Sequence, residues 1–506
     1  MRLAGRLALV ALAIWVVHLK VDTTGAAQPA RRTHLVIVVD GLRPDSVTAD
    51  VMPRLYRLGR RGIVFTAHHS VFPTVTRVNA SSFVTGAYPE THGLLGNTIY
   101  VPAVSATKTL DTGEREDLEA VERAEGRLLT APTLGEILQR EGRKLLGVSS
   151  GSTGSAYLLN HTTSGGAIIH TDYTKPPELA PKVLALLGPP PAHATPNDPQ
   201  NQRAIDAYLK LGVDDLRPDV TFLWLNDPDG TAHANGVGAP LTKTSLSLVD
   251  AGIGRLEDGL RMRGLLGSTN IVVTSDHGFS TETSELHLEA LVAPFSTPMQ
   301  DGSKDIVVAE GAIYLRSAAA KARVSEIVAM LKRRTEVGAI FTRAASPGGM
   351  EGMVPGTLSF DVARWNHPRS GDILVSANWS EDSNQFGFKG TSTQEGVAGH
   401  GTSSPYDIHN TLIAAGPDFR ENATSDAPTA NVDIAPTLLR LLGIAVPPTM
   451  TGRVIEEGLR GGAAVRLTRT VGGTIPGSAD GGYSVSAHFT TVNNSRYLDY
   501  TEVKRR

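Results

Sequence analysis

Runs of consecutive apolar residues alternate along the chain with segments in which apolar residues recur every three to four positions. Most residues in the segments 34–39, 220–225 and 270–274 are apolar. Such continuous apolar runs are typical of strands in a parallel sheet that helices cover on both faces. The periodicity of residues 202–211 and 246–266 instead predicts amphipathic helices. Strands that alternate with such helices predict an α/β fold with a mostly parallel central sheet and helices on both faces. Further strands are predicted at 63–66, 144–148 and 411–415, and further helices at 52–61, 133–141 and 434–442.

The pattern changes between residues 280 and 395. Strands predicted at 311–315, 338–342 and 372–377 surround a predicted helix at 318–334. This β-α-β-β series predicts a small α+β subdomain inserted into the main sheet. Beyond residue 461 the chain is rich in Gly, Ser and Thr, with short strand-like pieces, which is typical of a peripheral sheet edge or a mobile tail. We therefore expect a core at 33–279 and 396–460, an inserted subdomain at 280–395 and a peripheral C-terminal segment at 461–506.

The N-terminal residues predict a targeting segment instead of part of the fold. Arg2 and Arg6 precede an apolar run at 7–17, which is short for a membrane span. Small residues follow, with Gly25 and Ala27 placed for cleavage. This series predicts a secretory signal peptide at 1–27. The alternative is an uncleaved anchor, which is the only source of membrane contact that the sequence indicates.

Composition narrows the compartment and the partners of the protein. The chain has 506 residues and no cysteine, so it has neither disulfides nor thiolate chemistry. An exported chain of this size without cysteine is typical of the bacterial envelope, so we expect a periplasmic or secreted bacterial protein. The formal net charge is -3, so no basic field points to the binding of nucleic-acid polymers. A small anionic substrate would need local positive charge, which bound metal ions can provide.

Acidic, imidazole and hydroxyl side chains follow the predicted strands, at the edge where α/β sheets gather their active sites. Each has an ordinary explanation when taken singly, because Asp40 can begin a turn and Thr76 can be a helix N-cap. Gly278 permits the sharp turn that would let its two preceding residues reach one ion. As a set, three carboxylates and three imidazoles suit zinc better than calcium or magnesium, and they are enough for two ions. The candidate ligands are Asp40, Asp229, His233, Asp276, His277 and His400.

An ordered series of motifs resembles one protein family. The series begins with VDG at 39–41 and FPTVTRVN at 72–79, and TGAYPETHGLLGN then ends at Asn97. Asp229 with His233, SDHG at 275–278 and GHG at 399–401 follow. Over residues 33–459, the chain resembles the nucleotide pyrophosphatase/phosphodiesterase branch of the alkaline phosphatase superfamily. The resemblance implies an alkaline phosphatase-like fold and an enzyme that hydrolyses phosphate diesters or pyrophosphates with zinc.

The resemblance also implies a role for each candidate residue. Thr76 would be the nucleophile that forms a phospho-threonine intermediate, which water then hydrolyses. Asn97 would donate a hydrogen bond to a phosphate oxygen, and Thr74 is the rival hydroxyl. Two zinc ions are implied, although other divalent transition metals would suit the same ligands. One ion would be bound by Asp229, His233 and His400, and the other by Asp40, Asp276 and His277 together with the Thr76 oxygen.

Two departures from the family pattern bear on the substrate. The family's diesterases commonly have Thr-Phe-Pro-Asn where this chain has TRVN at 76–79, and Arg77 is equally compatible with substrate contact and with solvation. The superfamily's monoesterases and phosphonate hydrolases tend to carry Lys or Arg after the strand that corresponds to 144–148. Residues 149–155 contain neither, which favours a diester because it carries less charge.

Other readings of the same residues remain open. The first is a phosphomonoesterase or phosphonate hydrolase with the same metals, and the second is an envelope phospho-alcohol transferase. A sulfatase is disfavoured because its C/S-x-P-x-R motif is absent, and a non-catalytic binding protein is disfavoured because every implied ligand is present. The partner is a small phosphorylated substrate, and the sequence indicates neither its leaving group nor the oligomeric state. Histidines that match no ligand position are expected to be structural or exposed, among them His68, His69, His92 and His409.

Overall fold

The computed structural model describes residues 31–476, apart from 164 and 285, and residues 482–505. The signal peptide predicted at 1–27 lies outside the described residues. None of the described helices is both long enough and apolar enough to cross a membrane.

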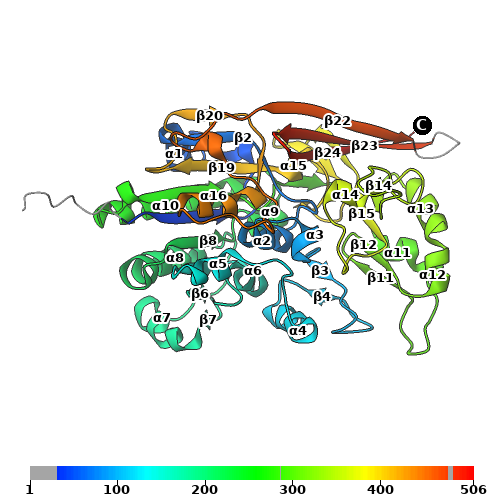
Figure 1. The fold of residues 1–506 in the computed structure, drawn as a ribbon, viewed down its shortest axis with the longest axis horizontal. Coiled ribbons are helices and arrows are strands. Elements are labelled where there is room, and N and C mark those ends of the chain that lie inside the picture. The colour runs from blue at the N-terminus through cyan, green and yellow to red at the C-terminus, as the bar shows by residue number, and fades with distance from the viewer. Residues whose placement is uncertain (1–30, 164, 285, 477–481, 506) are drawn as a thin grey trace, which may run out of the picture. The chain divides into compact units, whose positions relative to one another are not determined.

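A ten-stranded mixed sheet forms the centre of the fold (Figure 1). The strands in the middle of the sheet run parallel: the strand that contains His34–Val39 is parallel to both of its neighbours. One inner strand, β19, runs antiparallel to both of its neighbours. The predicted α/β fold with a mostly parallel central sheet is therefore confirmed. Across the sheet the strands are β20 (Ala423–Ser425), β2 (Ile63–His69), β19 (His409–Ala415), β9 (Thr269–Thr274), β1 (Thr33–Val39), β8 (Val220–Leu225), β5 (Leu145–Ser149), β6 (Ala167–His170) and β7 (Thr174–Lys175), with β21 (Thr429–Ala430) also paired to β2.

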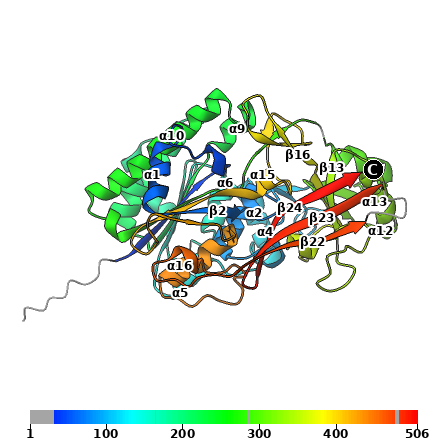
Figure 2. The ribbon, with the colours of Figure 1, turned by 90° about the horizontal axis from the view of Figure 1, so that it is seen from above.

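Helices cover both faces of this sheet, and the side chains of β1 point alternately to the two faces. Val36 and Val38 belong to one buried apolar cluster, and Leu35 and Ile37 belong to the other, as the two-residue period of a strand requires. Figure 2 shows the two helical layers on opposite sides of the strands. The first cluster includes α2 (Thr76–Thr85), α5 (Leu134–Arg140), α6 (Thr153–Leu159) and α16 (Ile434–Leu441), and the second includes α1 (Pro53–Arg61), α8 (Asp198–Ala207) and α10 (Pro240–Met262).

Several helix boundaries differ from the predicted ones. The helix α10 begins at Pro240 instead of residue 246, because proline suits the first turn of a helix. The helix predicted at 318–334 is two helices, α12 (Ala318–Ala322) and α13 (Val324–Lys332). The apolar spacing continues through this break, so the sequence pattern does not reveal it. After α8, the chain continues into a π-helix at Tyr208–Leu216.

Residues 280–395 contain most of two smaller sheets. One has five strands in the order β11-β12-β15-β13-β14 and packs its apolar side against α13. The other has the order β16-β17-β10-β18, and its strand β18 leads directly into the loop that carries His400. These strands are β10 (Ser280–Glu282), β11 (Ile306–Ala309), β12 (Ala312–Leu315), β13 (Val337–Thr342), β14 (Leu358–Ser359), β15 (Ile373–Ala377), β16 (Trp379–Ser383), β17 (Lys389–Ser392) and β18 (Ala398–Gly399).

The C-terminal residues form a three-stranded antiparallel sheet, drawn in red in Figure 1. Its strands are longer than the short pieces that the composition predicts, because each hairpin partner supplies a full hydrogen-bonding edge. The last strand is tied to the core, since the Thr501 N–H donates to the Ser403 carbonyl over 3.1 Å. The strands are β22 (Leu467–Pro476), β23 (Tyr483–Val492) and β24 (Ser495–Arg505).

Candidate metal centre and active site

The parallel strands of the central sheet bring the predicted site together at one edge. The carboxyl ends of β1, β8 and β9 lie side by side, as the topology of parallel sheets requires. Asp40 follows β1 and Asp276 follows β9, while β8 leads to α9 (Asp229–Asn235). His400 comes from the loop after β18, and Thr76 is the first residue of α2. All six predicted ligands lie in two groups beside this threonine.

The first group contains Asp229, His233 and His400, whose ligand atoms lie within 4.8 Å of one another. Oδ1 of Asp229 lies 3.3 Å from Nε2 of His233 and 3.5 Å from Nε2 of His400. Each ring is fixed through its other nitrogen: His233 Nδ1–H donates to the Ala398 carbonyl over 2.8 Å, and His400 Nδ1–H donates to the Thr74 carbonyl over 2.9 Å. Both Nε2 atoms therefore face Asp229, and metal-binding histidines are held in this way.

The second group contains Asp40, Asp276 and His277. His277 Nε2 lies 3.1 Å from Asp276 Oδ2 and 3.5 Å from Asp40 Oδ1, and its Nδ1–H donates to the Gly278 carbonyl over 3.0 Å. Gly278 does not adopt the left-handed backbone that a glycine-specific turn would need. It is required for space, because a Cβ atom there would lie 2.0 Å from the Tyr406 carbonyl oxygen.

The two groups adjoin, and their chemistry fits metal ions. The rings of His277 and His400 stack with centroids 3.4 Å apart. Asp40 Oδ1, Asp229 Oδ1 and Asp276 Oδ2 are buried without a hydrogen-bond donor among the described residues. Anionic oxygens buried in this way are unfavourable unless a cation lies beside them. Imidazole nitrogens mixed with carboxylate oxygens are typical of zinc and related divalent metals.

The pKa values of residues in both ligand groups also indicate that cations would stabilise the cluster. Burial and repulsion from the neighbouring carboxylates of Asp276 and Asp229 raise the pKa of Asp40 well above its usual value. Burial alone would lower the pKa of His233, but the Asp229 carboxylate raises it to about 9. Burial, helped by repulsion from His277, lowers the pKa of His400 to about 4. Protons therefore compete for the positions that metal ions would occupy, so metal binding is expected to release protons.

The two candidate hydroxyls have different surroundings. Thr76 Oγ1 lies 3.3 Å from His277 Nε2, beside the second group. Thr74 Oγ1 instead donates to the Thr402 carbonyl over 2.8 Å and accepts from the Gly401 N–H over 3.1 Å. Only Thr76 of this pair has its hydroxyl in the cluster, and it stands where the N–H groups and dipole of α2 favour negative charge.

Asn97 is held in place from both sides. Its Oδ1 accepts the Arg77 backbone N–H over 3.1 Å, which leaves the side-chain NH₂ as the donating group. Its own backbone N–H donates to the Glu310 carboxylate over 2.7 Å. Glu310 stands at positive φ, 54°, in the two-residue turn between β11 and β12. Glu310 was not among the residues predicted from the sequence, where a Glu-Gly pair between two apolar runs was the only signal for this turn.

Trp224 is a second residue that the sequence analysis did not single out. Its side chain is fully buried, and its Nε1–H donates to Asp40 Oδ2 over 2.8 Å. A buried tryptophan needs a partner for its N–H, and a tryptophan beside an acidic strand end was the available signal. This bond leaves Oδ1 of Asp40 as the oxygen that faces the cluster.

A cavity of about 260 Å³ opens beside these groups. The active-site loops contribute Phe72, Pro73 and Gly401, and residues 280–395 contribute apolar side chains and three glutamates. The described lining contains neither Lys, Arg nor His. The three glutamates are Glu282, Glu310 and Glu395.

The expected structural role of His92 is confirmed. The side chain is completely buried near α2, where His92 Nε2–H donates to Ser82 Oγ over 3.2 Å. Its Nδ1 accepts the Leu94 N–H over 3.1 Å. Both ring nitrogens are therefore used in packing the segment that leads to Asn97.

Comparisons with known proteins agree with this architecture. The family model for type I phosphodiesterase / nucleotide pyrophosphatase matches residues 34–401. Human ectonucleotide pyrophosphatase/phosphodiesterase family member 1 is 27% identical over 249 residues, which is 48% of this chain and 23% of that protein. The venom phosphodiesterase of Macrovipera lebetinus is 25% identical over 48% of this chain and 25% of its own length. The chain thus spans about a quarter of the length of these curated relatives.

The solved structures add a likeness of fold. Murine ectonucleotide pyrophosphatase / phosphodiesterase 5 superposes with a TM-score of 0.61 at 18% identity, covering 85% of this chain and all of that one. The central sheet and this likeness together define an α/β protein with an alkaline phosphatase-like fold. The chain belongs to the type I phosphodiesterase / nucleotide pyrophosphatase family, whose model matches more than half of its length.

Proposed function

We propose that this protein hydrolyses phosphate diesters or pyrophosphates with two zinc ions and a phospho-threonine intermediate. The observation that carries the proposal is that two groups of potential metal ligands adjoin each other beside one threonine hydroxyl. In each of Asp40, Asp229 and Asp276, one buried carboxylate oxygen has no hydrogen-bond donor among the described residues. Family membership supports the reaction class, because its curated relatives are named as pyrophosphatases and phosphodiesterases.

The residues divide the chemistry between them. Bound zinc ions would supply positive charge that lowers the pKa of the attacking hydroxyl and offsets charge on the phosphoryl oxygens. Thr76 loses its proton to water, its Oγ1 forms a bond to phosphorus, and the phosphorus–oxygen bond to the leaving group breaks. A water oxygen then attacks phosphorus, and the bond to Thr76 breaks with return of a proton to the hydroxyl. Asn97 is positioned to donate its NH₂ to a phosphoryl oxygen during both steps.

The charge around the site supports a diester over a monoester. Three glutamates line the adjacent cavity, and each ionised one would repel a second anionic charge on the substrate. Burial raises the pKa of Glu282 to about 7 and raises that of Glu310, so this repulsion grows as pH rises. The described lining offers no cation to offset that charge. We therefore place the leaving group of the diester in this cavity, where apolar side chains from residues 280–395 would contact it.

Nucleotides are the first substrates to test. The human relative and the murine neighbour carry nucleotide pyrophosphatase in their names, and an inactive variant of the murine neighbour was solved with AMP. We propose the same phosphorylated class for this chain. The word ectonucleotide in one relative's name and the venom origin of another support an exported location, which agrees with the signal peptide predicted at 1–27.

The proposed activity is tested by comparing bis-aryl phosphate, aryl monophosphate and aryl phosphonate substrates with and without zinc. We expect the diester to have the highest kcat/KM and to require metal. A large preference for the monoester or the phosphonate would overturn the substrate class. Efficient transfer of the phosphoryl-alcohol group to an added acceptor alcohol, with little release to water, would favour the transferase alternative instead.

The role of Thr76 as nucleophile is tested by substitutions in α2, with a control residue from the same helix. Thr76→Ala is expected to lose zinc-dependent turnover, by a factor of about 10⁴ or more, and Thr76→Ser to retain part of it. Thr85→Ala is the matched control, because its hydroxyl donates to the Ser81 carbonyl at the far end of α2. Full turnover by the Thr76→Ala enzyme would remove the proposed intermediate.

A further inference from the structure

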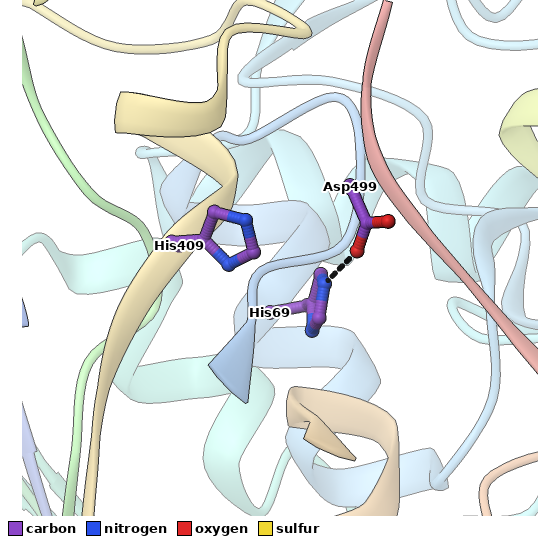
Figure 3. Close-up of side chains that lie close together, drawn as sticks. All are labelled: His69, His409 and Asp499. Carbon is purple, nitrogen blue, oxygen red and sulfur yellow. Dashed lines mark hydrogen bonds and ion pairs between the residues drawn. The ribbon is translucent and has the colours of Figure 1, made fainter. Parts of the chain in front are cut away.

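A third cluster of potential ligands lies outside both groups of the candidate active site. Figure 3 shows His69, His409 and Asp499 facing one another. One ligand atom from each lies within 4.8 Å of the other two. None of these residues belongs to a motif that the proposed reaction uses, and they come from three distant parts of the chain.

The backbone fixes two of these residues as a pair. His69 ends β2 and His409 begins β19, and the two are direct partners in the antiparallel ladder. Directly opposite residues have Cβ atoms about 4.5–5.5 Å apart, and the two imidazole centroids lie 4.6 Å apart. Asp499 approaches this pair from β24 of the C-terminal sheet. The site therefore spans the junction between the central sheet and the C-terminal sheet.

Each ring is anchored by the nitrogen that faces away from the cluster. His69 Nδ1–H donates to the Thr429 carbonyl over 2.9 Å, and His409 Nδ1 lies 3.4 Å from the His68 carbonyl. The other nitrogen of His69, Nε2, lies only 2.8 Å from Asp499 Oδ1, which is an acceptor when the carboxylate is charged. A ring nitrogen and a carboxylate oxygen approach this closely when either a proton or a metal ion lies between them.

The carboxylate is anchored in the same manner. Asp499 Oδ2 accepts the Thr490 hydroxyl over 2.8 Å, which leaves Oδ1 toward the imidazoles. The Tyr497 ring lies 5.6 Å from the His69 ring and shields one face of it. Ligands whose outer atoms are bonded to carbonyls or hydroxyls are characteristic of metal sites in proteins.

Charge and access also suit a cation. Burial, together with repulsion from His69, lowers the pKa of His409 to about 4, so this imidazole is neutral near pH 7 as a ligand must be. Although burial opposes it, the bond to His69 lowers the pKa of Asp499, so the carboxylate is charged. His409 also lines a groove of about 530 Å³ with Tyr406 and Tyr500, so water has access to this histidine.

We propose that His69, His409 and Asp499 bind a third divalent metal ion of the zinc type, which fastens the C-terminal sheet to the central sheet. Two imidazole nitrogens, one carboxylate oxygen and one water make the four-coordinate set that zinc accepts. The site lies close to the candidate active site, because Ser70, next to His69, donates its hydroxyl to the Asp276 carbonyl over 2.6 Å. The inference does not depend on the proposed reaction.

The test counts metal ions per chain in the full-length protein. Metal-free protein is dialysed against Zn²⁺ or Co²⁺, and the bound metal is measured by mass spectrometry. We expect Asp499→Asn and His409→Gln each to bind one ion fewer than the unaltered chain. His488→Gln is the matched control, because His488 lies on the adjacent strand β23, outside the cluster, and should bind the full number.

The difference of one ion is independent of how many ions the candidate active site takes up. Equal metal content in all four proteins would overturn the proposal and leave a protonated His69–Asp499 ion pair in its place. A Co²⁺ absorption band that is lost in His409→Gln provides a second readout, which remains valid if the Asp499 variant does not fold. Zinc should also raise the Tm of the Thr76→Ala enzyme more than that of a Thr76→Ala, His409→Gln double variant.

Discussion

The bond from Trp224 to Asp40 makes a quantitative prediction about metal affinity. Trp224→Phe removes the Nε1–H that lies 2.8 Å from Asp40 Oδ2 and keeps most of the buried ring. The lost donor leaves a second oxygen of Asp40 without a partner and raises the pKa of a carboxylate that burial already raises. Removing an outer hydrogen bond of this kind weakens metal binding about 10–100-fold, which is about 1.4–2.7 kcal/mol.

Chelator-buffered zinc titrations of metal-free protein measure this change. We expect one class of zinc sites to weaken by the stated factor in Trp224→Phe, with more protons released per ion bound at pH 7. Trp365→Phe is the matched control, since Trp365 is equally buried and its N–H donates over 3.0 Å to a neutral acceptor, the Leu95 carbonyl. It should lower stability by about 1 kcal/mol and leave zinc affinity unchanged. Unaltered affinity in Trp224→Phe, or an equal loss in both variants, would refute the reasoning.

Three further predictions concern positioning, space and pH. Glu310→Ala should lower kcat/KM for the diester about 10-fold at unchanged metal content, because a charged hydrogen bond to the Asn97 backbone is lost. The control is Glu395→Ala, which alters the same cavity without touching Asn97 and should leave kcat/KM unchanged. An equal loss of kcat/KM in both variants would assign the effect to the charge of the cavity. Gly278→Ala should displace His277 and lower the metal content, because the added Cβ atom would lie 2.0 Å from the Tyr406 carbonyl oxygen. The control is Gly267→Ala, whose added Cβ atom would have no neighbour within 4 Å and which should bind metal normally. Burial lowers the pKa of His92 from 6.5 to about 3, so the unfolded chain binds a proton below pH 6.5 that the folded chain does not. Stability should therefore fall as pH falls through that window, by about 1.4 kcal/mol per pH unit for this histidine. The free energy of unfolding is measured with urea at pH 6, 5 and 4 in the presence of chelator. Its slope against pH should be smaller by that amount in His92→Gln, and an unchanged slope would contradict the buried neutral state of His92.

The central sheet and the positions of its candidate ligands were predictable because strong local patterns determine them. Acidic residues follow the apolar runs of β1, β8 and β9 within a few positions, and parallel strands must bring those ends to one edge. Local patterning does not separate the rival hydroxyls, since Thr74 lies only two residues before Thr76, which begins α2, and the preference for Thr76 rested on the family motif. The structure distinguishes them by their contacts, one bonded to Thr402 and the other beside His277.

The parts that could not be predicted depend on contacts between distant segments. Glu310 reaches Asn97 only because a hairpin of the inserted residues folds back on the core. The pairing of His69 with His409 depends on β19 entering the sheet antiparallel beside β2, a choice that its apolar composition does not encode. Asp499 was assigned to a peripheral segment, and its approach to these histidines follows from strands that are longer than the pattern indicated.

The position of β19 has a consequence for the order of events during biosynthesis. This strand lies between β9 and β2 although it is made more than a hundred residues after β9, and the segment before it carries His400, the last of the candidate ligand imidazoles. A nascent chain that has emerged only as far as the inserted sheets therefore leaves a gap in the middle of its main sheet. Translation must run past residue 415 before that gap closes, so truncated chains should be trapped by proteases or chaperones as incomplete products.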